Sequence, residues 1–337
     1  MKERNANIDL IKLCACVGVV FIHTILTNAD PYGSYHGFLL TACYNAVPFF
    51  MMVTGYYLFS KRELSAGYTI RKILGILRFS LIWAVIFLII GMLLPGGFSI
   101  DPVLAFPSRF VLALYGIRIY DLYLILWYMG TLILIYLFAY FYYKFGFNRL
   151  CVFFTTASIG IILQILSYIY GESLTYSISL TIHLWTWLSY SMLGAMMPEI
   201  IGFFEHHLRL YIHVILFILS AALWICFVRI IGEKAFNDLY PENFYDSLCA
   251  LVYTGLGFSL LMRIRLSDRI KKIVLFLAPA TAGIYPLHMV FVSLAAASQS
   301  YGAALDPVLT VLAVLAVSFA VILPISKTRI GRYLTRI

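Results

Sequence analysis

The stretch KLCACVGVVFIH, residues 12–23, places ten apolar or small residues between a lysine and a histidine. It lies within an apolar run over residues 9–29, which is long enough for a helix to cross a hydrocarbon core of about 30 Å. An ionisable group at each end of such a segment is costly in lipid. The stretch therefore predicts a membrane-spanning helix that turns one polar face toward the protein interior.

The composition extends this prediction to the whole chain. Of its 337 residues, 63% are hydrophobic and 12% are charged, and the mean hydropathy is +0.94, whereas a soluble domain is about half apolar and a quarter charged. We therefore predict an all-α integral membrane protein: a polytopic bundle of about ten transmembrane helices in a single domain, residues 1–337. The apolar runs lie near 9–29, 37–59, 73–94, 121–143, 150–169, 181–201, 208–230, 246–262, 273–297 and 307–326.

The distribution of positive charge predicts the orientation. With the N-terminus inside, the inner segments hold 19 of the 24 Lys and Arg residues. The outer segments hold four of them, and Lys12 lies within the first span. Such a bias is typical of cytoplasmic loops and predicts that both termini are cytoplasmic. The four outer residues are Arg109, Arg118, Arg229 and Lys234.

The same charge bias argues against a nucleic-acid partner. The net charge of +9 is explained by the cytoplasmic loops, and membrane lipid is the expected surrounding. The six cysteines fall inside apolar runs and show no CxxC spacing. We therefore expect neither a metal site nor a disulfide framework.

Helical geometry relates the two ionisable ends of the opening stretch. Lys12 and His23 are 11 residues apart, which is about 20° beyond three full turns and about 16 Å along the axis. They therefore share one face, with Lys12 near the cytoplasmic boundary and His23 deeper. Two simpler interpretations remain open: Lys12 reaching to the inner headgroups, and His23 forming a hydrogen bond between helices.

Other polar residues interrupt later spans. The second span, YNAVPFFMMVTGYYLF (residues 44–59), contains Thr54 and Tyr56, and the ninth contains His288 in GIYPLH (residues 283–288). A proline beside a tyrosine and a histidine fits the wall of a cavity, although an interhelical hydrogen bond explains His288 equally well. Three bases lie at or just inside the cytoplasmic end of the third span, where they mark topology and also suit a phosphate-bearing donor. They are Arg71, Lys72 and Arg78.

Four motifs in this order resemble the membrane-bound acyltransferase-3 family, integral-membrane O-acyltransferases of surface glycans. The family's first-helix signature, a base, ten residues and a histidine, matches Lys12 and His23. Its helix-two pattern resembles VPFFMMVTGYYLF, its mid-chain motif resembles LWYMG with Trp127 and Tyr128, and its late motif resembles Ile284, Tyr285 and His288. The resemblance runs over nearly the whole chain.

The resemblance implies transfer of an acyl group, usually acetyl, from cytoplasmic acyl-CoA to a hydroxyl of an extracytoplasmic or lipid-linked glycan. No metal is implied, and separate glycan-assembly proteins are possible partners. His23 is then expected to act as general base or, alternatively, to carry a transient acyl group. Lys12 is expected at the catalytic site and, with the three bases, at the coenzyme's phosphates. Further roles follow for residues that orient the acceptor, stabilise the oxyanion or line the passage: Thr54, Tyr56, Trp127, Tyr128, Tyr285 and His288.

The chain also departs from the family pattern. Lys12 replaces the more common arginine and loses its planar fork. Gly75 stands where a second base is expected, Phe79 where proline is expected, and Ile125 where a histidine often precedes the Leu-Trp pair. These departures concern donor binding more than the class of reaction.

Two other functions remain open from the sequence. Polar residues at membrane depth serve a transporter of an acyl group or small molecule equally well, and acyl-CoA should not stabilise a transporter of another solute. A structural subunit of an export assembly should tolerate substitution at Lys12 and His23. In each case we expect a multi-pass protein of the cell membrane, specifically the bacterial cytoplasmic membrane.

Overall fold

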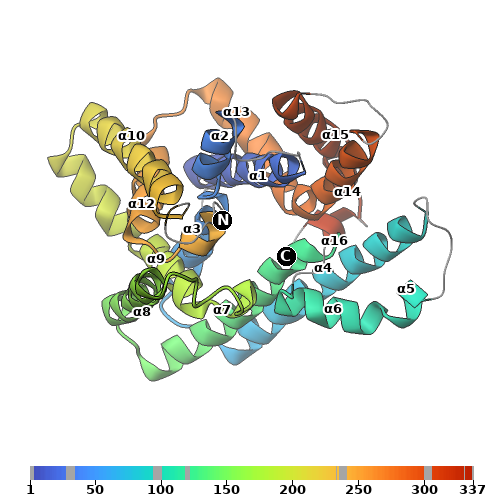
Figure 1. Cartoon of the computed structure of the whole chain (residues 1–337), viewed down its shortest axis with the longest axis horizontal. Helices are drawn as coiled ribbons and strands as arrows, with labels where there is room; N and C mark the ends of the chain where they lie inside the picture. The colour runs from blue at the N-terminus through green and yellow to red at the C-terminus, as the bar shows by residue number, and fades with distance from the viewer. Residues whose placement is uncertain are drawn as a thin grey trace.

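The computed structural model describes residues 4–27, 35–93, 101–117, 122–232, 234, 241–299, 306–329 and 331–335, and within these ranges it holds helices and no strand. The prediction of an all-α polytopic protein is confirmed (Figure 1). The helices are α1 (Ala6–Leu26), α2 (Tyr35–Cys43), α3 (Ala46–Leu58), α4 (Ala66–Leu93), α5 (Asp101–Leu104), α6 (Phe106–Tyr115), η1 (Leu124–Leu126), α7 (Trp127–Phe145), α8 (Arg149–Tyr170), η2 (Leu180–Ile182), α9 (Leu184–His207), α10 (Leu210–Phe227), η3 (Val228–Gly232), η4 (Pro241–Phe244), α12 (Leu248–Arg263), α13 (Asp268–Leu277), η5 (Ala278–Ala280), α14 (Thr281–Gln299), α15 (Pro307–Lys327) and α16 (Gly331–Thr335).

Where the structure describes them, the ten predicted apolar runs each coincide with one helix or with two or three consecutive helices. Within the described ranges, eight helical segments are long and apolar enough to cross a membrane. The other two predicted runs correspond to α9, which carries Glu199 and Glu205 near its end, and to α12, which has 16 residues. The eight segments are α1, α2 with α3, α4, η1 with α7, α8, α10 with η3, α13 through α14, and α15.

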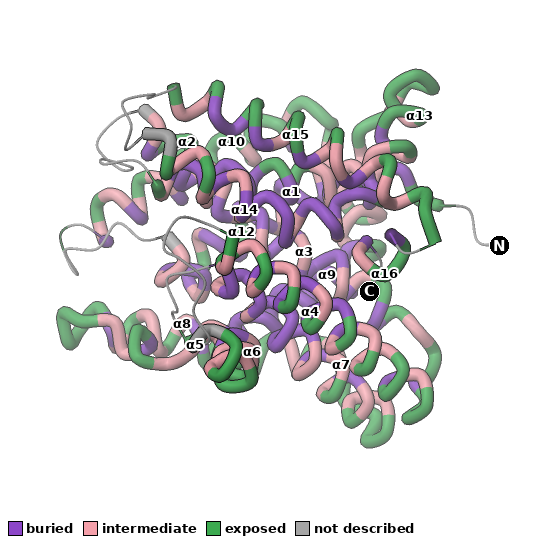
Figure 2. The backbone as a smooth tube through the Cα atoms, turned by 90° about the vertical axis from the view of Figure 1, so that its right-hand side faces the viewer, coloured by how far each residue is buried: buried purple, intermediate pink, exposed green. Residues whose placement is uncertain are grey.

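Helix α1 lies at the centre of the bundle. Its most apolar window is 67% buried, against 17% for α8 and α10 at the periphery, and it packs against α3, α14 and α15. Figure 2 shows α1 largely in the colour of buried residues. This position satisfies the requirement that a helix with ionisable side chains turn them away from lipid.

Local hydrogen bonds fix where α1 begins. The Asn5 side chain accepts from the backbone N–H groups of Asn7 and Ile8, as an N-cap residue does. The amide of Asn7 in turn donates to the carbonyls of Leu261, Met262 and Ile264. These carbonyls lie at the end of α12 and lack helical partners there. The start of α1 is thereby tied to the end of α12.

Helices α3 and α9 cross at two glycines. A Cβ built on Gly55 would lie 1.8 Å from the backbone oxygen of Ser191, and one on Gly194 would lie 2.1 Å from that of Met52. Each glycine therefore accommodates the backbone of the other helix, the close approach that small residues permit in membrane bundles. This contact places the cavity-facing side of α3, which carries Thr54.

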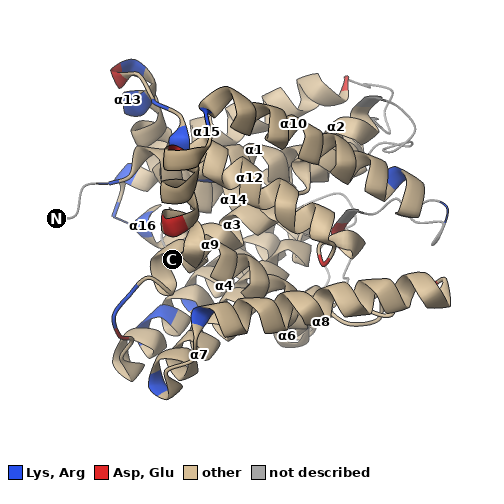
Figure 3. Cartoon of the chain, turned by 90° about the vertical axis from the view of Figure 1, so that its left-hand side faces the viewer, with Lys and Arg blue, Asp and Glu red and all other residues tan. Residues whose placement is uncertain are grey.

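Basic residues gather at one end of the bundle, and both ends of the chain lie there (Figure 3). Arg4 and Arg332, from the two ends of the chain, line the same cavity. This arrangement agrees with the charge bias in the sequence.

Candidate active site

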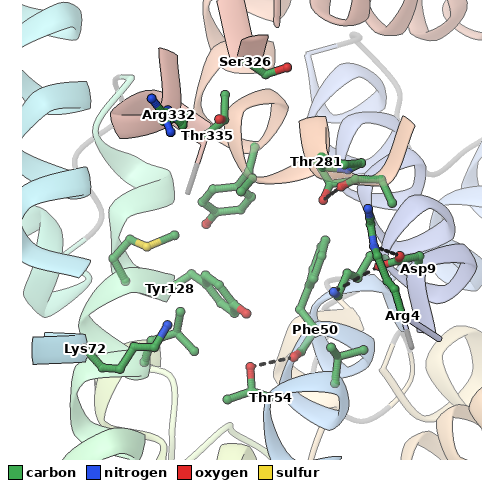
Figure 4. Close-up of a pocket in the computed structure, with 18 of the residues that line it drawn as sticks. Arg4, Asp9, Phe50, Thr54, Lys72, Tyr128, Thr281, Ser326, Arg332 and Thr335 are labelled. Carbon is green, nitrogen blue, oxygen red and sulfur yellow. Dashed lines mark hydrogen bonds and ion pairs between the residues drawn. The ribbon is translucent and has the colours of Figure 1, made fainter. Parts of the chain in front are cut away.

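A cavity of about 1080 Å³ lies at the basic end, among α1, α3, α4, α7 and the C-terminal helices α14–α16 (Figure 4). Its wall brings together residues that are more than 300 positions apart in the chain, such as Arg4 and Thr335. A smaller space of about 190 Å³ adjoins it and shares Lys12, Thr54 and Tyr136 with its lining. The volume slightly exceeds the range of roughly 300–1,000 Å³ that is typical of small-molecule sites, so the cavity can hold a large ligand.

The described lining of this cavity is strongly cationic. It contains five Lys or Arg residues and the single carboxylate of Asp9. Asp9 is buried and forms ion pairs with Arg4 and with Lys12, whose Nζ lies 3.3 Å from Oδ1. The wall therefore keeps a net positive charge, which suits a ligand with several negative groups. The five bases are Arg4, Lys12, Lys72, Lys327 and Arg332.

A series of aromatic rings leads from the cavity into the bundle. The ring centroids of Tyr128 and Tyr285, which both line the cavity, lie 5.5 Å apart. Tyr285 lies 6.3 Å from His288, and His288 lies 5.3 Å from His23. The two histidines are not part of the cavity lining, but they stand immediately behind Tyr285. One residue thus separates the cationic cavity from a pair of imidazoles.

Hydrogen bonding fixes the tautomer of His288. Its Nδ1 lies 3.1 Å from the carbonyl oxygen of Ile284, one turn earlier in α14. A carbonyl only accepts, so Nδ1 carries the proton and donates it. In the neutral ring Nε2 is then an acceptor, and this buried atom has no partner among the described residues. His288 therefore offers a lone pair within the bundle interior.

Tyr285 is held by a different hydrogen bond. Its hydroxyl donates to the carbonyl of Ile125 in η1, which uses the only proton that a phenol can donate. The ring is therefore fixed between α7 and α14, where it forms part of the cavity wall. Helix α14 continues through Pro286 to Gln299.

Five of the residues singled out in the sequence line the cavity, and two lie directly behind it. Lys12 comes from α1, Lys72 from α4 and Thr54 from α3, where the Thr54 hydroxyl donates to the carbonyl of Phe50 at 3.0 Å. Tyr128 and Tyr285 complete the five. The two behind the cavity are His23 and His288.

Four other predicted residues lie outside the cavity lining. Arg71 is exposed on α4, and Arg78 lies over the ring of Tyr333, 4.9 Å from its centroid. The two aromatic ones pack elsewhere. Tyr56 makes an edge contact with Tyr57, with centroids 5.3 Å apart, and Trp127 packs against Trp187 at the same centroid distance.

Comparison with known protein families shows the family to which the chain belongs. The model of an acyltransferase domain matches residues 5–327, nearly the whole chain. The chain belongs to the acyltransferase-3 family. Searches of curated proteins and of solved structures find no significant match. Family membership makes the chain a multi-pass membrane acyltransferase with an acyl donor and an acceptor, and it favours the enzyme over the transporter and the structural subunit.

The two departures from the family pattern on α4 have different surroundings in this acyltransferase. A Cβ added to Gly75 would meet nothing within 4 Å, so the position is open. Phe79 is buried and lies 6.5 Å, centroid to centroid, from Trp83 in a packed aromatic column. The expected base is therefore missing from an open site, whereas the expected proline is replaced by a core residue.

Three of the bases that line the acyltransferase cavity belong to no motif in the sequence. Arg4, Lys327 and Arg332 were counted only as topology charge, because nothing local distinguishes them from other inner-loop residues. Their only signal in the sequence was that they lie in the inner segments that carry most of the Lys and Arg residues.

Within the described residues, no group of three or more His, Cys, Asp or Glu side chains is placed to hold a metal ion.

Proposed function

We propose that this acyltransferase moves an acyl group, acetyl in the first instance, from acyl-CoA to a hydroxyl of an extracytoplasmic or lipid-linked glycan. The observation that carries the proposal is the cationic cavity joined through Tyr285 to the neighbouring imidazoles of His23 and His288. The cavity fits a donor with several phosphates, and the imidazoles fit the proton transfer.

The cavity's charges support coenzyme A as the donor. Its phosphates are ligands for Lys12 of α1 and Lys72 of α4, which both line the cavity, and charge-assisted contacts of this kind are among the stronger hydrogen bonds. Arg71 and Arg78, outside the lining, add positive charge at the same end. The uncharged arm of the coenzyme then follows Tyr128 and Tyr285 toward the histidines.

His23 acts as general base in this proposal. The acceptor oxygen attacks the thioester carbonyl, forming a C–O bond as the C–S bond breaks, and His23 takes the hydroxyl proton and passes it to the leaving thiolate. The products are the acylated glycan and free coenzyme A. His288 orients the acceptor, because its unpartnered Nε2 accepts a hydrogen bond while its Nδ1–H is held by Ile284.

The basic end is cytoplasmic in this proposal, which places both termini in the cytoplasm of a bacterial cell. The donor then enters from the cytoplasm, and the acceptor approaches the histidine pair from the other side of the membrane. Separate glycan-assembly proteins would supply the acceptor and carry the product onward.

Donor binding gives the first test. The purified full chain in detergent is heated with and without acetyl-CoA, and its melting temperature is recorded. We expect acetyl-CoA to raise the melting temperature in proportion to the logarithm of its concentration above Kd. A melting temperature that does not respond to acetyl-CoA at millimolar concentration contradicts the proposed donor.

A further inference from the structure

Helix α16, Gly331–Thr335, follows the residues that the family model matches, which end at 327. It nevertheless forms part of the cavity wall through Arg332 and Thr335. The donor site of this chain is therefore partly built from a segment outside the matched domain.

A tight turn brings α16 back onto the bundle. The Thr328 hydroxyl donates to the carbonyl of Ile325 and accepts from the N–H of Gly331, at 2.8 and 2.9 Å. A Cβ on Gly331 would lie 1.7 Å from the Ile325 carbonyl oxygen. Only glycine permits this approach, so the turn is specified by the sequence.

Contacts with α4 and α14 then hold α16 in place. The indole N–H of Trp83 donates to the carbonyl of Leu334 at 3.2 Å, and Arg78 lies over the ring of Tyr333. Thr335 is buried and packs so closely to Gly283 that a Cβ there would lie 2.9 Å from its methyl group. Contacts with two helices thus order this short segment, which would fray if nothing held it.

Arg332 faces the cavity without a partner. Among the described residues it makes no hydrogen bond, ion pair or ring contact, while Arg4 and Lys12 are engaged by Asp9. Figure 4 shows Arg332 and Lys72 from different helices around the same space. A guanidinium in this position has its full set of donors available for an oxyanion.

We propose that Arg332 binds a phosphate group of the acyl donor, so that α16 is a donor-binding element outside the residues that the family model matches. The inference rests on the proposed function, since it takes a phosphate-bearing thioester as the ligand. The planar fork of Arg332 pairs with two phosphate oxygens, as guanidinium groups commonly do. Its neighbour Lys327 adds a second cation from the end of α15.

Paired probes test the proposal. The dissociation constants of acetyl-CoA and of phosphate-free acetyl-pantetheine are measured on the purified full chain and on Arg332→Gln. We expect Arg332→Gln to raise the dissociation constant of acetyl-CoA by about tenfold or more, because the loss of a hydrogen bond to a charged group typically lowers affinity by such a factor. Acetyl-pantetheine should bind wild type and variant equally, since it carries no phosphate.

Three further variants control the result. Arg329→Gln removes an exposed arginine outside the cavity lining and should leave both dissociation constants unchanged. Arg332→Lys should recover part of the affinity for acetyl-CoA. Lys72→Gln should weaken acetyl-CoA whether or not Arg332 takes part, which tests the donor site by itself.

Two results overturn the assignment of Arg332. In one, Arg332→Gln binds acetyl-CoA as tightly as wild type while Lys72→Gln does not. In the other, Arg332→Gln weakens acetyl-CoA and acetyl-pantetheine to the same extent, which shows a structural role. A wild-type chain that does not bind acetyl-CoA contradicts the proposed function itself.

Discussion

In the proposed function, different single residues bind the acyl donor and activate the acceptor. Lys12 and His23 lie on one helix, and the structure places the first in the cavity wall and the second beside His288. The interpretation of Lys12 as a residue that only reaches for headgroups does not account for its ion pair with the buried Asp9. The residues proposed to bind the donor and to act as base thus lie in one continuous region of the structure.

Two adjacent bases on α4 allow a direct contact with the donor to be distinguished from a general effect of positive charge. Lys72 lines the cavity, whereas Arg71 is exposed beyond it. We expect Lys72→Gln to raise the KM for acetyl-CoA about tenfold, because it removes a contact to phosphate. Arg71→Gln should change KM less than threefold. Steady-state kinetics over a range of acetyl-CoA concentrations measures both, and equal effects would contradict a local contact by Lys72.

His288 should affect turnover more than donor binding. His288→Phe keeps an aromatic ring beside Tyr285 but removes the Nε2 acceptor. We expect kcat to fall by about 10²-fold or more, the lower range for proton-transfer residues, with the Kd of acetyl-CoA unchanged. A variant that transfers acyl groups at the wild-type rate would remove His288 from the mechanism.

Four site residues were predicted from the sequence because each belongs to a short local motif that resembles the family pattern. They are Lys12, Thr54, Tyr128 and His288. Arg332 was not, because its place depends on a turn at Gly331 that brings a chain end back onto the bundle. Trp127 shows the converse: its motif was recognised, but its ring packs on Trp187.

At the scale of the elements, the crossing of α3 and α9 holds the cavity wall. We expect Gly55→Ala to lower the free energy of unfolding by about 1–3 kcal/mol or more, as overpacking does, because its Cβ would overlap the Ser191 backbone. Thermal unfolding of the purified protein in detergent measures the effect.

Gly75→Ala is the matched control on α4. The added methyl group meets nothing within 4 Å, and alanine favours a helix over glycine by about 0.5–1 kcal/mol. Its melting temperature should equal or exceed that of wild type. If the two variants melt alike, the close contact of α3 with α9 does not limit stability.

The positions of the helices along the chain could be predicted from the apolar runs, since the length of each span is set by the bilayer. The apolar runs did not predict which helices pack against each other. The central place of α1 was indicated by its polar face, but the pairing of α3 with α9 depends on Gly55 and Gly194 together. Glycines lie throughout this chain, and only the three-dimensional arrangement shows which two oppose each other.

For the whole molecule, the charge bias predicts the side of the membrane on which each loop lies. Single cysteines are introduced at exposed Glu63, at the basic end, and at exposed Glu172, after α8, in a variant without the native cysteines. We expect a membrane-impermeant maleimide to label the residue-172 variant on intact cells. The residue-63 variant should react only after permeabilisation. The reverse pattern would place the donor cavity outside the cytoplasm and contradict the proposed orientation.

The most direct test of the account asks whether His23 is needed for acylation of a glycan. Surface and lipid-linked glycans are analysed by mass spectrometry from cells that express wild type, His23→Ala, or His207→Ala, which changes an exposed histidine at the end of α9. With equal amounts of protein in the membrane, we predict acylated glycan with wild type and with His207→Ala, and at least about a 10²-fold loss with His23→Ala. Unchanged acylation with His23→Ala would contradict the account.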